Sequence, residues 1–145
     1  MVRDLLLGFE SFDIDLVVEG NGMTFGSELA RRFDAKVRLH PEFQTASVIF
    51  QDGRQVDVAT ARLEFYQYPA ALPQVETSSL HQDLYRRDFT INAMAVSLNR
   101  ENFGEIVDYF NGREDLERGL VRVLHNLSFV EDPTRLLRGV RLEKR

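Results

Sequence analysis

Two aspartates separated by one apolar residue are the part of this sequence best suited to chemistry. Asp13 and Asp15 flank Ile14 within residues 12–18, a run whose composition predicts a strand. Side chains two positions apart in a strand point to the same face, so the two carboxylates converge and repel unless a cation or solvent relieves them. Mg²⁺ prefers oxygen ligands and is commonly held by one or two carboxylates and substrate phosphates. The pair therefore predicts a Mg²⁺ site, with a solvated strand end as the alternative.

A third acid, Asp57, has the same setting in another predicted strand. Residues 46–51 and 54–60 form two apolar runs joined by Asp52-Gly53, which is a strong signal for a β-hairpin. If the second of these strands neighbours the strand that carries Asp13, three carboxylates meet on one patch. A solvated acid on an exposed sheet face is the alternative for Asp57.

Arginine dominates the basic residues and is concentrated beside an apolar segment. It accounts for 16 of the 18 basic side chains, and the cluster Arg86-Arg87-Asp88 runs through Asn92 into apolar residues. The planar guanidinium suits bidentate contact with phosphate. The cluster predicts either a triphosphate-binding segment or a solvated edge.

The last predicted helix, over residues 133–145, begins with Asp132 and Pro133. Aspartate followed by proline is typical of a helix N-terminus. Asp132 and Arg135 are three residues apart, so both can project to one side of the helix start. A carboxylate acceptor beside a guanidinium donor matches the amine and ring nitrogen of adenine and cytosine, and such a contact discriminates by roughly 1–3 kcal/mol. The pair predicts a base-reading site for ATP and CTP, and a simple helix cap is the alternative.

These residues need a scaffold of alternating strands and helices. Besides the elements above, the pattern predicts helices over 2–7, 24–33 and 114–118, a strand over 120–124 and a long surface loop over 66–85. The alternation predicts an α/β fold class.

Composition limits the classes of protein that remain. The chain has 145 residues, no cysteine and a formal net charge of −5. This excludes a disulfide framework and a thiolate metal site, and the absence of a long apolar stretch favours a soluble cytoplasmic protein without membrane contact. A negative charge is not typical of a domain that grips nucleic acid by itself. Both ends lack capping signals, so we expect a piece of a longer protein.

Taken together, five segments resemble, in the correct order, the motifs of one enzyme family. They are 2–8 with 13–15, 56–62, 86–92, 108–116 and 131–135. The family is that of the class II tRNA nucleotidyltransferases (CCA-adding enzymes) and the bacterial poly(A) polymerases, within the DNA polymerase beta superfamily. The resemblance implies the polymerase beta-like nucleotidyltransferase fold, an α/β (α+β) architecture with a mixed or antiparallel sheet backed by helices. It also implies an N-terminally truncated head domain over 1–130 and the start of a helical neck over 131–145.

The resemblance implies addition of C, A or both from CTP and ATP to the 3′ end of tRNA, by two-metal phosphoryl transfer with Mg²⁺. Asp13 and Asp15 would hold metal and, with Asp57, form the catalytic set. The implied nucleotide-binding residues are Arg3, Arg86, Arg87, Asp88, Asn92, Asp132 and Arg135. Segment 108–116 is implied to be a flexible element that couples domain movement to catalysis. Most tRNA contacts would come from body and tail domains after residue 145, so we expect these 145 residues alone to add nucleotides poorly.

The sequence leaves the exact reaction open. CCA, CC or A addition and poly(A) synthesis are all compatible with these segments. A catalytically inactive nucleotide-binding module and a purely structural role for the acids are the alternatives from other classes. The intact set of three acids argues against a retired site, because mutually repelling charges have no use there.

Overall fold

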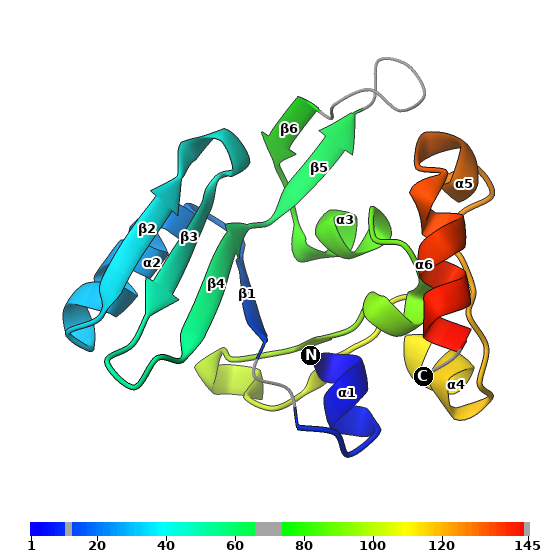
Figure 1. Cartoon of the computed structure of the whole chain (residues 1–145), viewed down its shortest axis with the longest axis horizontal. Coiled ribbons are helices and arrows are strands. Elements are labelled where there is room, and N and C mark those ends of the chain that lie inside the picture. The colour runs from blue at the N-terminus through cyan, green and yellow to red at the C-terminus, as the bar shows by residue number, and fades with distance from the viewer. Residues whose placement is uncertain (11–12, 66–73, 144–145) are drawn as a thin grey trace. The chain divides into compact units, whose positions relative to one another are not determined.

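The computed structural model describes residues 1–10, 13–65 and 74–143, and the chain divides into two compact units. The first unit contains Arg3–Leu63 and Val75–Asp83, and the second contains Glu64–Gln74 and Leu84–Arg145. Figure 1 labels the helices and strands β1 to β6. None of the helices in the described residues is long and apolar enough to span a bilayer.

The first unit is built on a mixed four-stranded sheet in the order β1-β4-β3-β2 (Figure 1). Its strands are β1 (Ile14–Val18), β2 (Lys36–His40), β3 (Thr45–Ile49) and β4 (Gln55–Thr60). β1 is parallel to β4, whereas the β2–β3 and β3–β4 pairs are antiparallel. The predicted α/β class with a mixed sheet is therefore confirmed.

The hairpin of β3 and β4 forms where the sequence predicted it. Gly53 has a φ of +86°, a conformation that glycine adopts without steric cost, and Phe50 N–H donates to the Arg54 carbonyl across the turn at 2.9 Å. This turn fixes a register in which Ser47 lies opposite Asp57.

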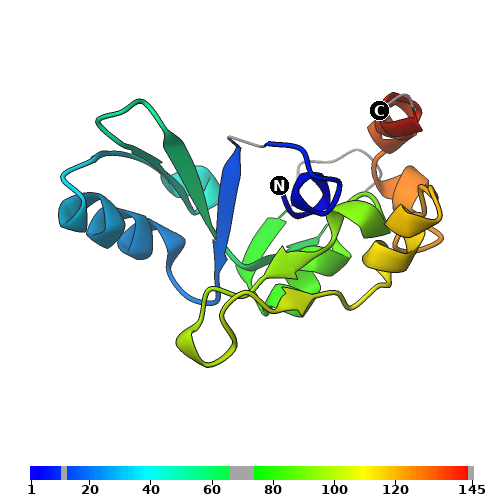
Figure 2. The same cartoon turned by 90° about the horizontal axis from the view of Figure 1, so that it is seen from below.

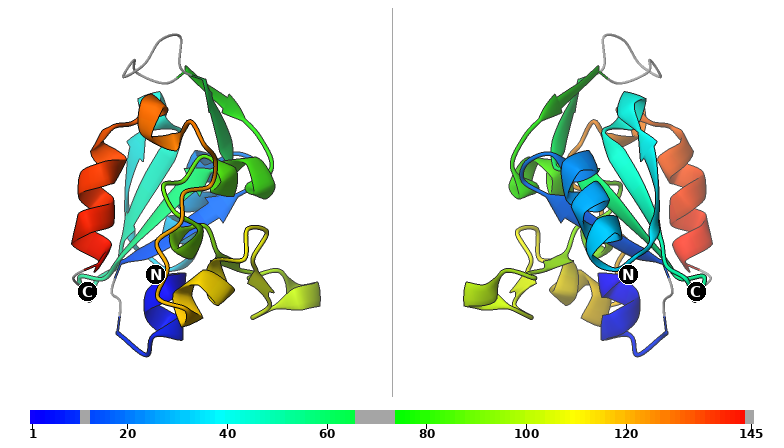
Figure 3. Two further views of the ribbon diagram at one scale, coloured as in Figure 1. Left: turned by 90° about the vertical axis from the view of Figure 1, so that its right-hand side faces the viewer. Right: turned by 90° about the vertical axis from the view of Figure 1, so that its left-hand side faces the viewer.

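Helix α2 (Gly22–Arg32) covers one face of this sheet, as Figures 2 and 3 show. The helix begins two residues earlier than predicted, because the Asn21 side chain accepts a hydrogen bond from the Thr24 amide at 2.9 Å and so caps it. Gly26 permits close packing, since a Cβ there would lie 2.6 Å from the Ala46 Cβ. The buried residues between helix and sheet are Ala30, Ala46, Val48, Val56 and Val58.

The first unit also contains α1 (Val2–Leu6), close to the predicted helix over 2–7, and the 3₁₀ turn η1 (Pro41–Phe43). Strand β5 (Arg62–Phe65) pairs with β6 (Gln74–Thr77), and α3 (Leu80–Tyr85) follows. The long loop predicted over 66–85 is therefore wrong from residue 74 onward, while residues 66–73 lie outside the described ones. The Ser79 side chain and carbonyl accept hydrogen bonds from the first turn of α3, so Ser79 caps this helix.

The second unit consists of short elements around the buried residues Phe89, Ile91, Ala93 and Met94. They are the 3₁₀ turns η2 (Thr90–Asn92) and η3 (Arg100–Asn102), the paired strands β7 (Ala95–Val96) and β8 (Ile106–Val107), and helices α4 (Gly112–Glu117), α5 (Ser128–Glu131) and α6 (Thr134–Glu143). Figure 3 shows α6 continuing from α5. The strand predicted over 120–124 is wrong: the segment is irregular and joins Phe89 through an isolated antiparallel bridge at Val123.

Candidate functional site

Three carboxylates meet on the sheet of the first unit. Asp15 lies on β1 directly beside Asp57 on β4, and Asp13 precedes β1 by one residue. One oxygen from each of the three carboxylates lies within 4.8 Å of the other two. Asp13 and Asp15 are exposed and Asp57 is partly buried, so an ion can reach them from solvent. The strand pairing that the sequence required for convergence is present.

Asp57 is held in place by its neighbours. Ser47, opposite it on β3, donates its hydroxyl to Asp57 Oδ1, and Gln55 Nε2 donates to both carboxylate oxygens at 3.0 and 3.1 Å. These neutral donors orient the carboxylate without cancelling its charge. Three such charges at this spacing repel one another, and an all-oxygen donor set suits a hard divalent cation. The three residues could therefore hold a metal ion.

The cluster Arg86-Arg87-Asp88 lies in the second unit, where Asp88 is nearly buried. Its Oδ1 accepts hydrogen bonds from the Phe89 amide at 2.8 Å and from Asn92 Nδ2 at 3.0 Å. Its Oδ2 lies 2.8 Å from Nη2 of Arg138 on α6. Two of the predicted nucleotide-binding residues, Asp88 and Asn92, are thus in direct contact, and the ion pair ties them to α6.

Asp132 and Arg135 also lie in the second unit, at the start of α6. Asp132 Oδ1 accepts from the Thr134 amide at 2.9 Å, which is the capping contact that the sequence suggested. Its Oδ2 lies 3.9 Å from Arg135 Nε, so acceptor and donor do face one side. Arg135 is 5% exposed, and its Nη2 donates to the Arg86 carbonyl at 3.0 Å. The side chain predicted to read the base therefore also touches the arginine cluster.

Arg3 lies in the first unit, where Nη2 pairs with the Asp4 carboxylate at 2.9 Å. The predicted residues thus form two groups. Asp13, Asp15 and Asp57 converge in the first unit. In the second unit Asn92 contacts Asp88, and Arg135 contacts both Asp132 and the Arg86 carbonyl.

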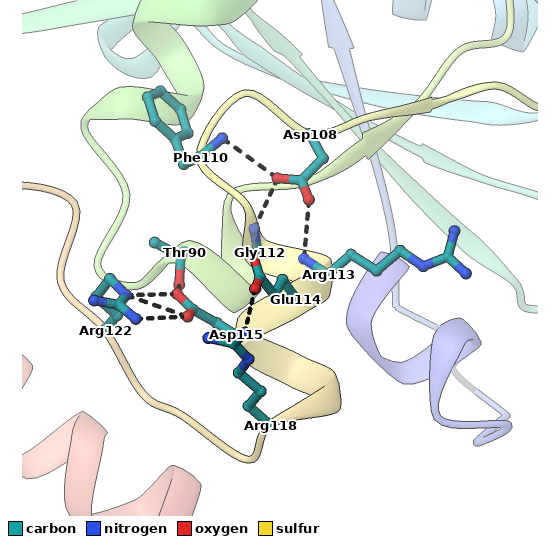
Figure 4. Close-up of polar contacts among 9 residues, drawn as sticks. All are labelled: Thr90, Asp108, Phe110, Gly112, Arg113, Glu114, Asp115, Arg118 and Arg122. Carbon is teal, nitrogen blue, oxygen red and sulfur yellow. Dashed lines mark hydrogen bonds and ion pairs between the residues drawn. The ribbon is translucent and has the colours of Figure 1, made fainter.

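Segment 108–116, which the resemblance implies to be flexible, contains two aspartates that accept several hydrogen bonds (Figure 4). The Asp108 carboxylate accepts from the amides of Gly112 at 2.8 Å and Arg113 at 2.9 Å, at the start of α4. Asp115, 4% exposed, accepts from Thr90 Oγ1 at 2.7 Å and from Arg122 Nε at 2.9 Å. Helix α4 is therefore anchored to η2, the turn that contains Asn92.

The hydrogen bond from Arg122 is the main reason that the pKa of the Asp115 carboxyl lies below its ordinary value of 3.8. The hydrogen bond from Thr90 acts in the same direction against the opposing effect of burial. Because the pKa is lower in the folded state, this carboxylate contributes stability that is present above the unfolded-state pKa and is lost as the pH falls through the folded-state pKa.

We expect Asp115→Asn to destabilise the chain at neutral pH by about 1–3 kcal/mol, because the charged partner of Arg122 is removed. As the pH falls below 3.8, the difference from the wild type should shrink, since the wild type then loses the same contribution. Urea unfolding at a series of pH values measures this, with the exposed Glu105→Gln as the control. A difference that stays constant down to the lowest pH would contradict the role of this carboxylate.

Sequence reasoning missed several residues that hold the two groups in place. Counting outward from a two-residue Asp52-Gly53 turn would pair residue 48 with residue 57. The observed loop is one residue longer and is closed by Phe50 and Arg54, so Ser47 lies opposite Asp57 instead. Arg122, Ser128 and Arg138 had no local signal, since each contacts a residue brought near by tertiary folding.

Residues 1–122 match the family model described as the poly A polymerase head domain. An A-adding tRNA nucleotidyltransferase of Geobacter sulfurreducens is 58% identical over 144 residues, which are 99% of this chain and 16% of the relative. The apo form II structure of a CCA-adding enzyme aligns with a TM-score of 0.94 and 52% identity, over 99% of this chain and 34% of that one. A tRNA nucleotidyltransferase complexed with a primer tRNA and an incoming ATP analog aligns with a TM-score of 0.84 and 48% identity, over 97% and 38% of the two chains. The chain thus spans about a sixth to two fifths of these relatives.

Proposed function

The chain belongs to the poly A polymerase head domain family, and from this premise we propose that the whole protein adds nucleotides to the 3′ end of tRNA. The reaction would use ATP or CTP. Terminal A addition is the first reaction to test, since a relative 58% identical is named as an A-adding tRNA nucleotidyltransferase. The observation that carries the proposal is the convergence of Asp13, Asp15 and Asp57 on one sheet.

In this proposal Asp13 and Asp15 hold Mg²⁺, and Asp57 completes the carboxylate set. The fit rests on the donor set itself, which offers three anionic oxygens within 4.8 Å of one another. When bound, Mg²⁺ would lower the pKa of the attacking 3′-hydroxyl and offset negative charge on the phosphates. Ser47 and Gln55 keep Asp57 oriented through the hydrogen bonds described above.

The second group of residues would bind the nucleotide. Arg86 and Arg87, together with Arg3, would offset the charge of the triphosphate. Asp88 would accept a hydrogen bond from the ribose 2′-hydroxyl. In the structure this carboxylate is 7% exposed and contacts Phe89, Asn92 and Arg138.

Incubation of the whole protein with tRNA tests the proposal directly. One tRNA should lack only its terminal A and another should lack all of CCA, and each nucleotide is supplied separately with Mg²⁺. A addition predicts that the first tRNA grows by one residue with ATP alone. Growth of the second tRNA with CTP would indicate CC or CCA addition, and long products with ATP would indicate poly(A) synthesis. Nucleotide binding without any extension would contradict the proposal and favour an inactive nucleotide-binding module.

Asp132→Ala tests the base-reading pair in the same assay. We expect the preference for ATP and CTP over GTP and UTP to fall by about tenfold or more, because a contact of this type is worth about 1–3 kcal/mol. The reason is that the acceptor for the exocyclic amine is lost while Arg135 remains. The variant Glu105→Gln, an exposed carboxylate change in the same unit, is the control. An unchanged preference in Asp132→Ala would remove Asp132 from base reading.

A further inference from the structure

We propose that Ser128 is a specificity-determining positioning residue, one that fixes both members of the base-reading pair, Asp132 and Arg135. The inference rests on the proposed function of that pair. It adds a residue that touches neither the base nor the phosphates and acts through the two side chains that would.

Ser128 contacts both residues, through different atoms. Its hydroxyl accepts a hydrogen bond from Nη1 of Arg135, and its backbone carbonyl accepts one from the Asp132 amide at 3.3 Å. Its own amide donates to the His125 carbonyl at 3.1 Å. One residue thus connects the acceptor and the donor of the pair to the segment that precedes them.

Both side chains are buried, so losing the hydrogen bond between them is costly. Ser128 is 0% exposed and Arg135 is 5% exposed. A buried guanidinium must have hydrogen-bond partners, because an unpaired buried charge is costly. Arg135 is held by the Ser128 hydroxyl, by the Arg86 carbonyl and, at longer range, by the Asp132 carboxylate. The planar group is therefore fixed in one orientation.

A capping role does not account for this serine. Ser128 is the first residue of α5, but the N-cap position is taken by Leu127, and the serine hydroxyl points to Arg135 on the next helix. A serine that served only to start α5 would direct its hydroxyl to an amide of the same helix. The choice of residue is explained by the contact with Arg135.

Loss of the hydroxyl should affect selection more than binding in general. In Ser128→Ala the Arg135 guanidinium keeps its charge and its contact with the Arg86 carbonyl, but it loses the hydrogen bond that orients Nη1. The pair then no longer presents acceptor and donor at a fixed spacing. Affinity for the correct base falls toward that for the wrong base, while phosphate attraction is retained.

The experiment measures the dissociation constants of ATP and GTP for the whole protein by calorimetry, so that base reading is observed without nucleotide transfer. Whether the protein adds nucleotides at all is measured separately, by the tRNA extension assay. We expect S128A to reduce the ratio of the GTP to the ATP dissociation constant by about tenfold. Ser27→Ala is the matched control, since Ser27 donates to the Met23 carbonyl within α2 and lies in the other unit. S128T, which keeps the hydroxyl, should restore the ratio.

Two results would overturn the inference. In one, S128A weakens ATP and GTP binding by the same factor, which is what a merely structural serine would do. In the other, S128A leaves both dissociation constants at their wild-type values. If the additional methyl group prevents S128T from folding, the comparison of S128A with S27A is enough to decide whether Ser128 affects base selection.

Discussion

Asp13→Asn is expected to reduce nucleotide addition by at least about a thousandfold, because a site of this kind supplies several kcal/mol of charge stabilisation. The amide is neutral and a weaker ligand, so one of three anionic oxygens is lost from the cluster. The fold should be retained, since Asp13 is exposed and precedes β1. The measurement is tRNA extension by the whole protein, with the unfolding midpoint recorded in parallel.

Asp34→Asn is the matched control for this experiment. It makes the same chemical change at an exposed aspartate with a φ of +50°, a conformation that asparagine also tolerates. Binding of Mn²⁺ as a probe ion, followed by calorimetry, adds a readout that does not depend on turnover. Retained extension in Asp13→Asn, or equal Mn²⁺ affinity in the two variants, would remove Asp13 from the proposed site.

Gly112→Ala is expected to destabilise the chain by more than about 3 kcal/mol, at the upper end of overpacking effects. A Cβ at this position would lie 2.2 Å from the Thr90 carbonyl oxygen and 2.9 Å from its carbonyl carbon. Both atoms belong to the backbone, so relief requires α4 and η2 to separate. This separation would also break the hydrogen bond between Thr90 and Asp115. Urea unfolding of the chain measures the loss.

Gly139→Ala is the comparison, because a Cβ there would lie 3.3 Å from Cζ of the Phe89 ring. A ring edge can shift by a few tenths of an ångström, and alanine is favoured over glycine within a helix. We therefore expect a much smaller change in the free energy of unfolding. If the two alanine variants were equally stable, the close approach of α4 to η2 would not be a constraint on the fold.

Features of the fold that are set by residues close together in the sequence were predicted correctly. The hairpin around Asp52-Gly53 and the capping aspartate at residue 132 are set by local backbone chemistry. The pairing of β1 with β4 was foreseen as a condition for the acids to meet, and the mixed sheet followed the expected class. The assigned roles of the site residues, and a boundary between head and neck at residue 130, stay predictions.

Most of the missed or wrong predictions concern contacts between residues on different elements, which a single sequence does not reveal. Strand β2 was missed although Val37 and Leu39 alternate with polar residues, which is a strand pattern. It is a short edge strand in which both residues are exposed, at 40% and 45%. Residues 120–124 resemble a strand in composition, but they join Phe89 at a single bridge. Arg138, Arg122 and Ser128 were missed because their partners lie on other elements.

The parallel pairing of β1 with β4 has a consequence for how the acidic cluster comes into being. Asp15 and Asp57 are adjacent in space but separated by α2, β2 and β3 along the chain. A parallel pair cannot close through a tight turn, so the entropy of closing a long loop must be overcome before the pair forms. The full set of three carboxylates is therefore available to a divalent ion only after the first unit has folded. A nascent chain that ends before β4 carries two of the three ligands and lacks the third.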